Sequence, residues 1–298
     1  MEDEEVFVRV EDQGRLMEIS EVIREDLPFS ASMHNCLVLH ARGFASSQDF
    51  YELRTPTNSL IILSRSKGEQ DTVTLFCCED DVGLLMEGLE KTRLIDWTKP
   101  FFFLHLPVYM AEGIRALVES RAEGQGDFQF VETFLYSKED DEEGLLCPAG
   151  MRVCHLGERG VRQLHAAWQY NKYVDVSRFL SLARHPTNVG VYESDVGEVH
   201  RVEPTSLQRA GDEESAVAWV ALTFYGTTGM LYTVESHRRR RLARLALRVF
   251  SRLQDKQGLI PHAFVEDYND SSRRLFSQLP GWRSVTRTLI VGVKIDLH

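Results

Sequence analysis

The segment Leu231–Ala243 has residue types and a spacing that suit the binding of a polyanion. A short apolar run, Leu231–Val234, leads into four consecutive arginines, Arg238–Arg241, which open a helical pattern. Arginines at a helix N-terminus oppose the helix macrodipole, and the free backbone N–H groups at that end already attract an anion. Four cations there are unfavourable unless a polyanion binds, although a solvated arginine face is the simpler alternative. The pattern therefore indicates a phosphate-bearing ligand held by a strand, a loop and a helix.

The elements around these arginines can be predicted from hydrophobic periodicity. After Arg241 the apolar residues recur at the spacing of one buried helix face. They are Leu242, Leu245, Ala246, Val249, Phe250 and Leu253. Before the arginines we expect two strands joined by a turn at 226–229, and after them a strand, a helix and a last strand. The expected ranges are Ala216–Phe224, Met230–Val234, Leu259–Val265, Asn269–Gln278 and Leu289–Ile295.

The rest of the chain alternates helical and strand patterns, which predicts an α/β (α+β) fold with mixed sheets. Ser194–Glu214 is polar and broken by Gly and Pro, so we expect a long surface loop there. The acidic run Glu139–Glu143 indicates a linker, which predicts domains at 1–145 and 150–298. Helices are expected around Leu16–Leu27, Val82–Leu89, Ala111–Val118, Val161–Trp168 and Val176–Leu182. Strands are expected at Cys36–Leu39, Leu60–Leu63, Val73–Cys78, Phe101–Leu106, Phe128–Tyr136 and Val189–Tyr192.

The composition argues against several classes of protein. The 298 residues are 43% apolar and 27% charged, as in an ordinary globular protein, and no apolar run approaches the roughly 20 residues of a membrane span. The net charge of −11 argues against a nucleic-acid partner. The five cysteines have no regular spacing, so we expect neither a disulfide framework nor a metal site. The acidic N-terminus resembles neither a secretory signal nor a transit peptide, which favours the cytoplasm, with the mitochondrion as the alternative.

The order of strand, arginine-led helix, strand and asparagine-led helix resembles that of the Gcn5-related N-acetyltransferase (GNAT) superfamily. The cofactor motif of that superfamily, Gln/Arg-x-x-Gly-x-Gly/Ala, is matched by Arg238-x-x-Arg241-x-Ala243. Its downstream signature is matched by Asn269, Ser272, Leu275-Phe276 and Gly281-Trp282.

More narrowly, the chain resembles the glycine N-acyltransferase family. The similar segments are Leu94–Trp97, the helix of Trp168, Val176–Leu180 and Gly226–Arg238. This resemblance covers nearly the whole chain and implies two tandem GNAT-like halves, each a mixed β-sheet flanked by helices. It implies a degenerate first half and a second half that uses acyl-CoA or acetyl-CoA as co-substrate.

The resemblance also implies which residues bind the cofactor. The strand residues would contact the pantetheine arm and supply one N–H to the thioester oxygen, and the arginine loop would hold the pyrophosphate. The usual motif glycines are Arg239 and Arg241 here, which lack the backbone freedom of glycine. Asn269 would contact the pantetheine arm or cap its own helix. The expected cofactor-binding residues are Leu231, Tyr232, Thr233, Val234, Arg238, Arg239, Arg240, Arg241, Leu242, Ala243, Asn269 and Ser272.

The catalytic candidates are Thr227, Glu266 and Tyr268. Thr227 aligns with the glutamate base of the glycine-specific family, a role that a threonine cannot fill. Phe276 aligns with the frequent tyrosine acid of the superfamily. Further candidates for moving a proton are Glu235, Asp267, His237, His262 and Tyr232.

The function that the resemblance implies is acyl-CoA-dependent transfer of an acyl group to a small amine or amino acid. One alternative is a non-catalytic descendant that binds coenzyme A or a protein partner. Another is an acetyltransferase that acts on proteins or polyamines. The sequence specifies neither the acceptor, the acyl chain length nor the oligomeric state.

Overall fold

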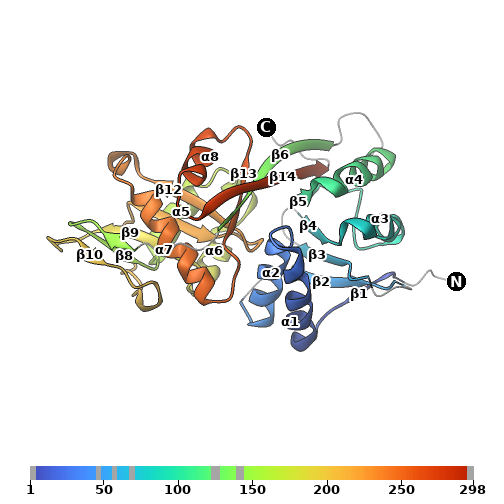
Figure 1. Cartoon of the computed structure of the whole chain (residues 1–298), viewed down its shortest axis with the longest axis horizontal. Helices are drawn as coiled ribbons and strands as arrows, with labels where there is room; N and C mark the ends of the chain where they lie inside the picture. Colours follow the sequence, from blue (N-terminus) through green and yellow to red (C-terminus); the bar gives the residue numbers. More distant parts are fainter. Residues whose placement is uncertain are drawn as a thin grey trace. The chain divides into compact units, whose positions relative to one another are not determined.

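The computed structural model describes residues 5–44, 48–55, 59–66, 71–121, 128–138 and 144–293. The acidic run Glu139–Glu143, which we interpreted as a linker, lies outside these residues. The described chain divides into two units, each with its own sheet (Figure 1). Unit 1 contains residues 1–135, 264–270 and 285–298, and unit 2 contains residues 136–263 and 271–284. The units therefore differ from the expected linear domains, because two C-terminal segments belong with the first unit.

Unit 1 is organised around an eight-stranded mixed sheet whose order is β1-β2-β3-β4-β5-β14-β6-β13. Neighbours from β1 to β4 pair antiparallel, β4 pairs parallel with β5, and β14 pairs antiparallel with β5. The last three strands of this order continue into unit 2 at one end. The strands are β1 (Phe7–Arg9), β2 (Gln48–Leu53), β3 (Ile62–Ser66), β4 (Asp71–Phe76), β5 (Phe101–Pro107), β6 (Phe128–Lys138), β13 (His262–Glu266) and β14 (Trp282–Val293).

Helices cover both faces of this sheet because its strands alternate between two separate cores. Phe50 and Ile62 pack with α1 and α2, whereas their neighbours Tyr51 and Leu63 pack with α3 and α4. The helices are α1 (Gln13–Val22), α2 (Ala31–Ala41), α3 (Val82–Lys91) and α4 (Val108–Arg121), with 3₁₀ turns η1 (Ile23–Asp26) and η2 (Glu79–Asp81).

The strand expected at Cys36–Leu39 is wrong, because these residues lie inside α2. Every residue from Ala31 to Leu39 is buried, so this helix has no exposed face in its first nine residues. A short apolar run without periodicity does not distinguish a buried strand from a buried helix.

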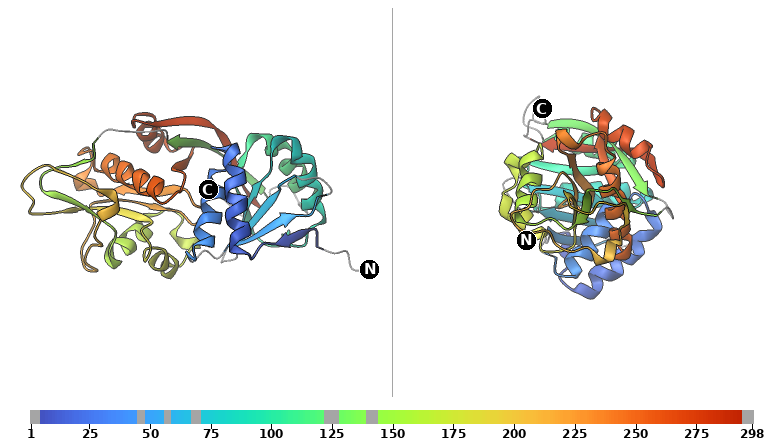
Figure 2. Two further views of the ribbon diagram at one scale, coloured as in Figure 1. Left: turned by 60° about the horizontal axis from the view of Figure 1, so that its bottom comes forward. Right: turned by 90° about the vertical axis from the view of Figure 1, so that its left-hand side faces the viewer.

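Unit 2 contains a four-stranded antiparallel sheet in the order β12-β11-β9-β8. One face is covered by α5 and α6, whose apolar residues join Trp219 and Ala221 in one core. The other face is covered by α7, which contacts β9, β11 and β12 (Figure 2). The strands are β8 (Met151–Cys154), β9 (Asn188–Glu193), β11 (Ala218–Leu222) and β12 (Thr228–Thr233). The helices are α5 (Glu158–Ala167), α6 (Val176–Leu182), α7 (Leu242–Lys256) and α8 (Asp270–Ser277), with 3₁₀ turns η3 (Asn171–Tyr173), η4 (Pro204–Ser206) and η5 (Glu235–His237).

The expected surface loop at Ser194–Glu214 is mostly exposed, but it is anchored to its surroundings. It contains β10 (His200–Arg201), which pairs with β7 (Leu146–Cys147), and the turn η4. Further along, the backbone N–H of His155 donates to the carbonyl of Gln208, and the carbonyl of His155 accepts the N–H of Ala210. Gly157 permits this close approach, because a Cβ atom there would lie 2.3 Å from the carbonyl oxygen of Gly211.

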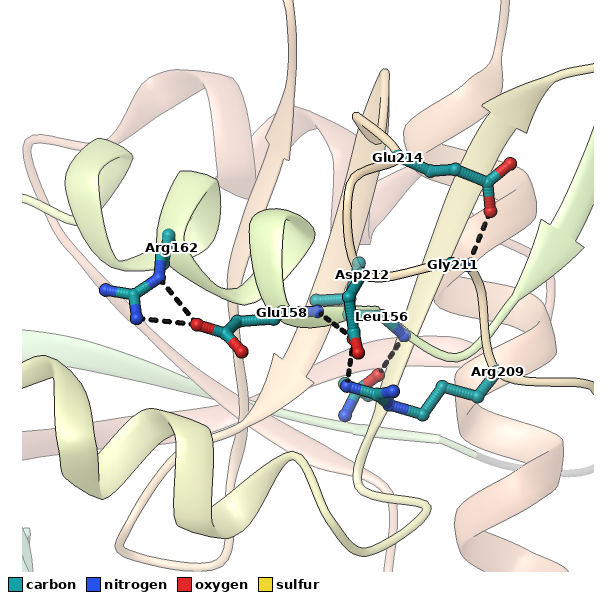
Figure 3. Close-up of polar contacts among 8 residues, drawn as sticks. Leu156, Glu158, Arg162, Arg209, Gly211, Asp212 and Glu214 are labelled. Carbon is teal, nitrogen blue, oxygen red and sulfur yellow. Dashed lines mark hydrogen bonds and ion pairs between the residues drawn. The ribbon is translucent and has the colours of Figure 1, made fainter.

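The anchored loop also caps α5 (Figure 3). The Asp212 carboxylate accepts the backbone N–H of Glu158 at 3.0 Å and pairs with Arg209 at 2.6 Å. These two contacts lower the pKa of Asp212 below its usual 3.8. Two residues on, Glu214 accepts the N–H of Gly211 and pairs with Arg152, and both contacts lower its pKa. A carboxylate at a helix N-terminus satisfies a free donor and interacts favourably with the macrodipole.

Candidate functional site

The arginines predicted to bind an anion lie between β12 and α7 in unit 2. The turn η5 follows β12, and the arginine segment, defined as Arg238–Arg241, connects η5 to the first helical residue, Leu242. The side chains of the segment are all exposed, whereas Leu242 is buried. The segment is therefore a surface loop between two fixed elements, as the sequence predicts.

The backbone of the arginine segment is left-handed at two positions. Arg239 has a φ of 62° and Arg241 a φ of 63°. The resemblance to the GNAT superfamily implies glycine at both positions, and glycine adopts this conformation without steric cost. For an L-residue with a side chain the left-handed conformation costs about 1–2 kcal/mol. The arginines thus reproduce the glycine backbone at a cost in stability.

The N-terminus of α7 has no capping side chain. Its N-cap residue is Arg241, which makes no side-chain cap hydrogen bond, and its first turn contains no acidic residue. The first N–H groups of a helix have no intrahelical acceptor. Backbone donors and guanidinium groups consequently share this end of the helix, which is the arrangement that favours an anion.

Arg238 is held against β12. Its Nε donates to the carbonyl oxygen of Thr233 at 3.3 Å, and its guanidinium lies 5.6 Å from the ring centroid of Tyr232. Tyr232 in turn stacks on Trp219 of β11, with ring centroids 5.2 Å apart. The predicted cofactor strand and the first arginine therefore form one connected surface. At the other end of the segment, Arg244 of α7 donates to the carbonyl oxygen of Gln278.

The strand β12 contains a bulge that the sequence analysis missed. Trp219 pairs with Tyr232 and Ala221 with Gly229, so Met230 and Leu231 together oppose a single residue of β11. Met230 has a φ of 54°. A bulge leaves one residue outside the ladder and redirects the strand, and bulges are common beside active sites. Since β12 is also an edge strand of its sheet, its backbone can bond to an extended ligand.

His237 connects the arginine segment to β9. Its Nε2 lies 3.0 Å from Oε1 of Glu193, the last residue of β9, and its Nδ1 lies 2.9 Å from Oγ of Ser236. Both ring nitrogens are thus engaged by neighbouring side chains. The other histidine candidate, His262, is fully buried, and its Nδ1 lies 2.8 Å from the carbonyl oxygen of Ile260.

Thr227 and Phe276, which the resemblance aligns with a base and an acid, are both buried. Thr227 is only 4% exposed, and its hydroxyl lies 2.8 Å from the Thr223 hydroxyl within the turn between β11 and β12. Phe276 is also 4% exposed and packs against the rings of Tyr136 and Trp282. Their surroundings account for both residues structurally.

The remaining candidates fall into different units. Glu266, Tyr268 and Asn269 belong to the 264–270 segment of unit 1, where the Asn269 N–H donates to the carbonyl oxygen of Glu266. Tyr268 is 58% exposed. Ser272 belongs to unit 2, with the strand and the arginine segment. Within unit 2 the structure therefore brings Leu231–Val234 and Arg238–Ala243 together into one continuous surface.

Two further properties of the described residues concern membranes and metals. In the ranges that the structure describes, no helix is both long enough and apolar enough to span a bilayer. The same ranges contain no group of three or more His, Cys, Asp or Glu side chains arranged to hold a metal ion.

Comparisons with known proteins place the site in context. Residues 207–291 match the FR47-like protein family, a range that includes β12, the arginine segment and α7. No curated protein matches the chain significantly.

Among solved structures, the X-ray structure of a Drosophila protein is similar over 97% of this chain and 98% of its own, with a TM-score of 0.72 at 16% identity. Two bacterial proteins are similar with lower TM-scores. A GCN5-related N-acetyltransferase-like protein from Streptococcus suis has a TM-score of 0.46 at 13% identity, over 95% of this chain and 100% of its own. A GNAT-family acetyltransferase from Colwellia psychrerythraea has a TM-score of 0.47 at 12% identity, over 96% of this chain and 98% of its own. The predicted mixed α/β fold, with a large mixed sheet flanked by helices, is confirmed.

Proposed function

We propose that the protein is an acyl-CoA-dependent N-acyltransferase of the GNAT superfamily whose second unit binds the acyl donor at β12, the arginine segment and the N-terminus of α7. The family match over residues 207–291 agrees with this proposal. The acceptor that we propose is a small amine or an amino acid.

The observation that carries the proposal is the concentration of left-handed backbone in this stretch. Among the residues that the structure describes, four non-glycine residues have a positive φ. Three of them, Met230, Arg239 and Arg241, lie within twelve consecutive positions of β12 and the arginine segment. Such conformations persist only where the surrounding structure imposes them, and they cluster at functional sites. A stretch that retains them without glycine is best explained by a ligand that contacts its backbone.

The residues present fit the diphosphate of coenzyme A. Exposed guanidinium groups and free backbone N–H groups meet at the start of α7, and both donate to phosphate oxygens. The edge of β12 offers backbone donors and acceptors to the amide groups of a pantetheine arm. Near the bulge at Met230, a backbone N–H outside the ladder could hold the thioester oxygen as charge develops on it.

Coenzyme A supplies the acyl group as a thioester when it is bound, and its thiolate is a good leaving group. The chain must therefore orient the thioester, exclude water and remove one proton from the acceptor ammonium. Glu266 and Tyr268 remain our candidates for the proton step. Thr227 stays a candidate only because the resemblance aligns it with the glutamate base. Its hydroxyl bonds to the hydroxyl of Thr223, which accounts for it structurally.

One observation favours a second candidate function. Two positions where related families carry an acid or a base hold buried residues, Thr227 and Phe276, with no ionisable group. A non-catalytic descendant that binds coenzyme A without transferring its acyl group would have this property.

Calorimetry with acetyl-CoA, combined with measurement of thiol release, separates the two functions. The amine panel should contain glycine, other amino acids, spermidine and lysine peptides. We expect saturable binding and thiol release that depends on one class of amine. Binding without release would favour the non-catalytic descendant, and release with lysine peptides or spermidine alone would favour a protein or polyamine acetyltransferase.

The double substitution of Arg238 and Arg241 with alanine tests the phosphate contacts. We expect weaker coenzyme A binding and a smaller loss of affinity as salt rises, because fewer charge-assisted contacts remain to be screened. Arg159→Ala on α5 is the matched control, since this arginine lies outside the arginine segment. Unchanged affinity in the double variant would remove the basis for placing the diphosphate here.

A further inference from the structure

We propose that Glu193 and His237 form a positioning pair that holds the arginine segment in its anion-binding conformation. This inference rests on the proposed function, since the anion at issue is coenzyme A. Neither residue belongs to the cofactor motif, which begins at Arg238, and β9 and η5 are far apart in the sequence.

The arginine segment needs support at both ends because two of its four residues are left-handed. At its C-terminal end the support is clear. Leu242 is buried, and the carbonyl of Arg241 accepts the N–H of Leu245, the first hydrogen bond of α7. The side chains of the segment are exposed, so its own burial contributes little.

At the N-terminal end the support comes from His237. Its side chain is only 14% exposed, and its ring contacts Ser236 and Glu193. Its backbone N–H donates to the carbonyl of Val234. Arg238 begins immediately after this ring. A hydrogen bond from Nε2 to a strand residue of the sheet fixes the point at which the segment leaves η5.

Because Glu193 is negatively charged, its effect on the anion through charge and its effect through positioning predict opposite changes in affinity. A carboxylate close to an anion site repels the anion, so charge alone predicts tighter binding when Glu193 is removed. A positioning role predicts the opposite result, because the His237 ring loses its anchor and the segment samples other conformations. The sign of the change in affinity therefore decides between the two.

The test measures coenzyme A binding by calorimetry in full-length Glu193→Ala, Glu193→Gln and Glu198→Ala variants. We expect Glu193→Ala to weaken binding about three- to tenfold, the range of a typical protein hydrogen bond, because the Glu193 side chain is 72% exposed. Glu193→Gln keeps an acceptor oxygen for Nε2–H without the charge, so it should bind at least as tightly as the wild type. Glu198→Ala removes an exposed carboxylate after β9 and should also bind at least as tightly.

A second pair of variants tests whether Glu193 acts through the histidine. His237→Ala should weaken binding, and adding Glu193→Ala to it should cause no further loss, because the bond is already gone. The proposal is overturned if Glu193→Ala binds as tightly as the wild type, or if Glu193→Gln is as weak as Glu193→Ala. A wild-type protein that binds no coenzyme A would instead contradict the proposed function.

Discussion

At the scale of single residues, the left-handed arginines are the most unusual feature of the chain. Arg239 and Arg241 take the backbone conformation of glycine while retaining long charged side chains. The resemblance implies that arginine replaces two motif glycines, but the sequence does not specify whether the backbone follows the glycine path or a helical one. That choice depends on tertiary contacts, here the buried Leu242 and the bonded His237 ring.

Glycine and alanine substitutions measure the strain at these positions. We expect Arg241→Gly to be more stable than Arg241→Ala by about 1 kcal/mol, because only glycine adopts a positive φ without steric cost. At Arg240, where φ is not positive, the order should reverse by about 0.5–1 kcal/mol, since glycine loses more conformational entropy on folding. Denaturant unfolding of the four variants gives both differences. The same order at both positions would contradict a strained backbone at Arg241.

Other site residues differ in how far the sequence could predict them. The apolar strand and the arginines were recognisable from residue types and spacing alone. Glu193 was not, since a carboxylate at a strand end is common and its partner His237 is distant in the sequence. The bulge at Met230 left no signal either, because methionine has no preference for a positive φ.

At the scale of elements, periodic helices and the buried strands β9 and β11 were predicted, whereas the buried helix α2 was not. The helix α7 keeps its polar face, and its apolar stripe marked it correctly. The helix α2 lacks an exposed face over its first nine residues, so its apolar part Cys36–Leu39 was mistaken for a strand. The strand β14 begins at Trp282, earlier than the sequence predicts. The prediction began late because exposed residues such as Arg283 and Arg287 interrupt the apolar pattern in the first half of the strand.

The cap of α5 by the loop residue Asp212 leads to a prediction about pH. The N–H of Glu158 and the guanidinium of Arg209 lower the pKa of Asp212 in the folded state, so its ionised form stabilises the fold. Because the pKa of Asp212 is lower in the folded state than in the unfolded state, its ionisation stabilises the fold. This stabilisation is complete above the unfolded pKa near 3.8 and is lost as the pH falls through the pKa of the folded state. Asp212→Ala should therefore unfold more easily than the wild type at pH 7, with a difference that shrinks below about pH 4.

Urea unfolding at pH 7, 5 and 3.5 checks this prediction. Glu213→Ala is the control, because Glu213 is the next carboxylate in the loop and accepts from Arg159 only through its backbone carbonyl. A difference between Asp212→Ala and wild type that stays constant across the three pH values would rule out the ionised cap.

At the scale of the whole molecule, the two units are not consecutive stretches of sequence. Val291 and Val293 of β14 are buried in the same core as Phe101 and Phe103 of β5, although nearly two hundred positions separate the strands. The expected boundary at 145–150 followed charge and turn signals, which report local flexibility. Strand pairing at long range leaves no such signal in a single sequence.

Dividing the chain at the expected boundary should therefore fail. We expect separate fragments 1–145 and 150–298 to lack cooperative unfolding, because the first lacks the strand between β5 and β6 and the second exposes the apolar residues of β14. Mixing the fragments during refolding should restore a cooperative transition, measured by circular dichroism. The control is the intact chain with a protease site inserted within residues 139–143 and cut after folding, which should remain associated. A cooperative transition in either isolated fragment would show that it folds alone.

The position of β14 also affects how the protein is made. A ribosome releases β5 long before it reaches Trp282, and N-terminal segments generally fold first during synthesis. Here the first unit cannot complete its sheet until the codons of β14 have been read. Until then one edge of β5 has no partner, and unpaired strand edges promote aggregation. The nascent chain should therefore need protection by chaperones from the synthesis of β5 until β14 has emerged.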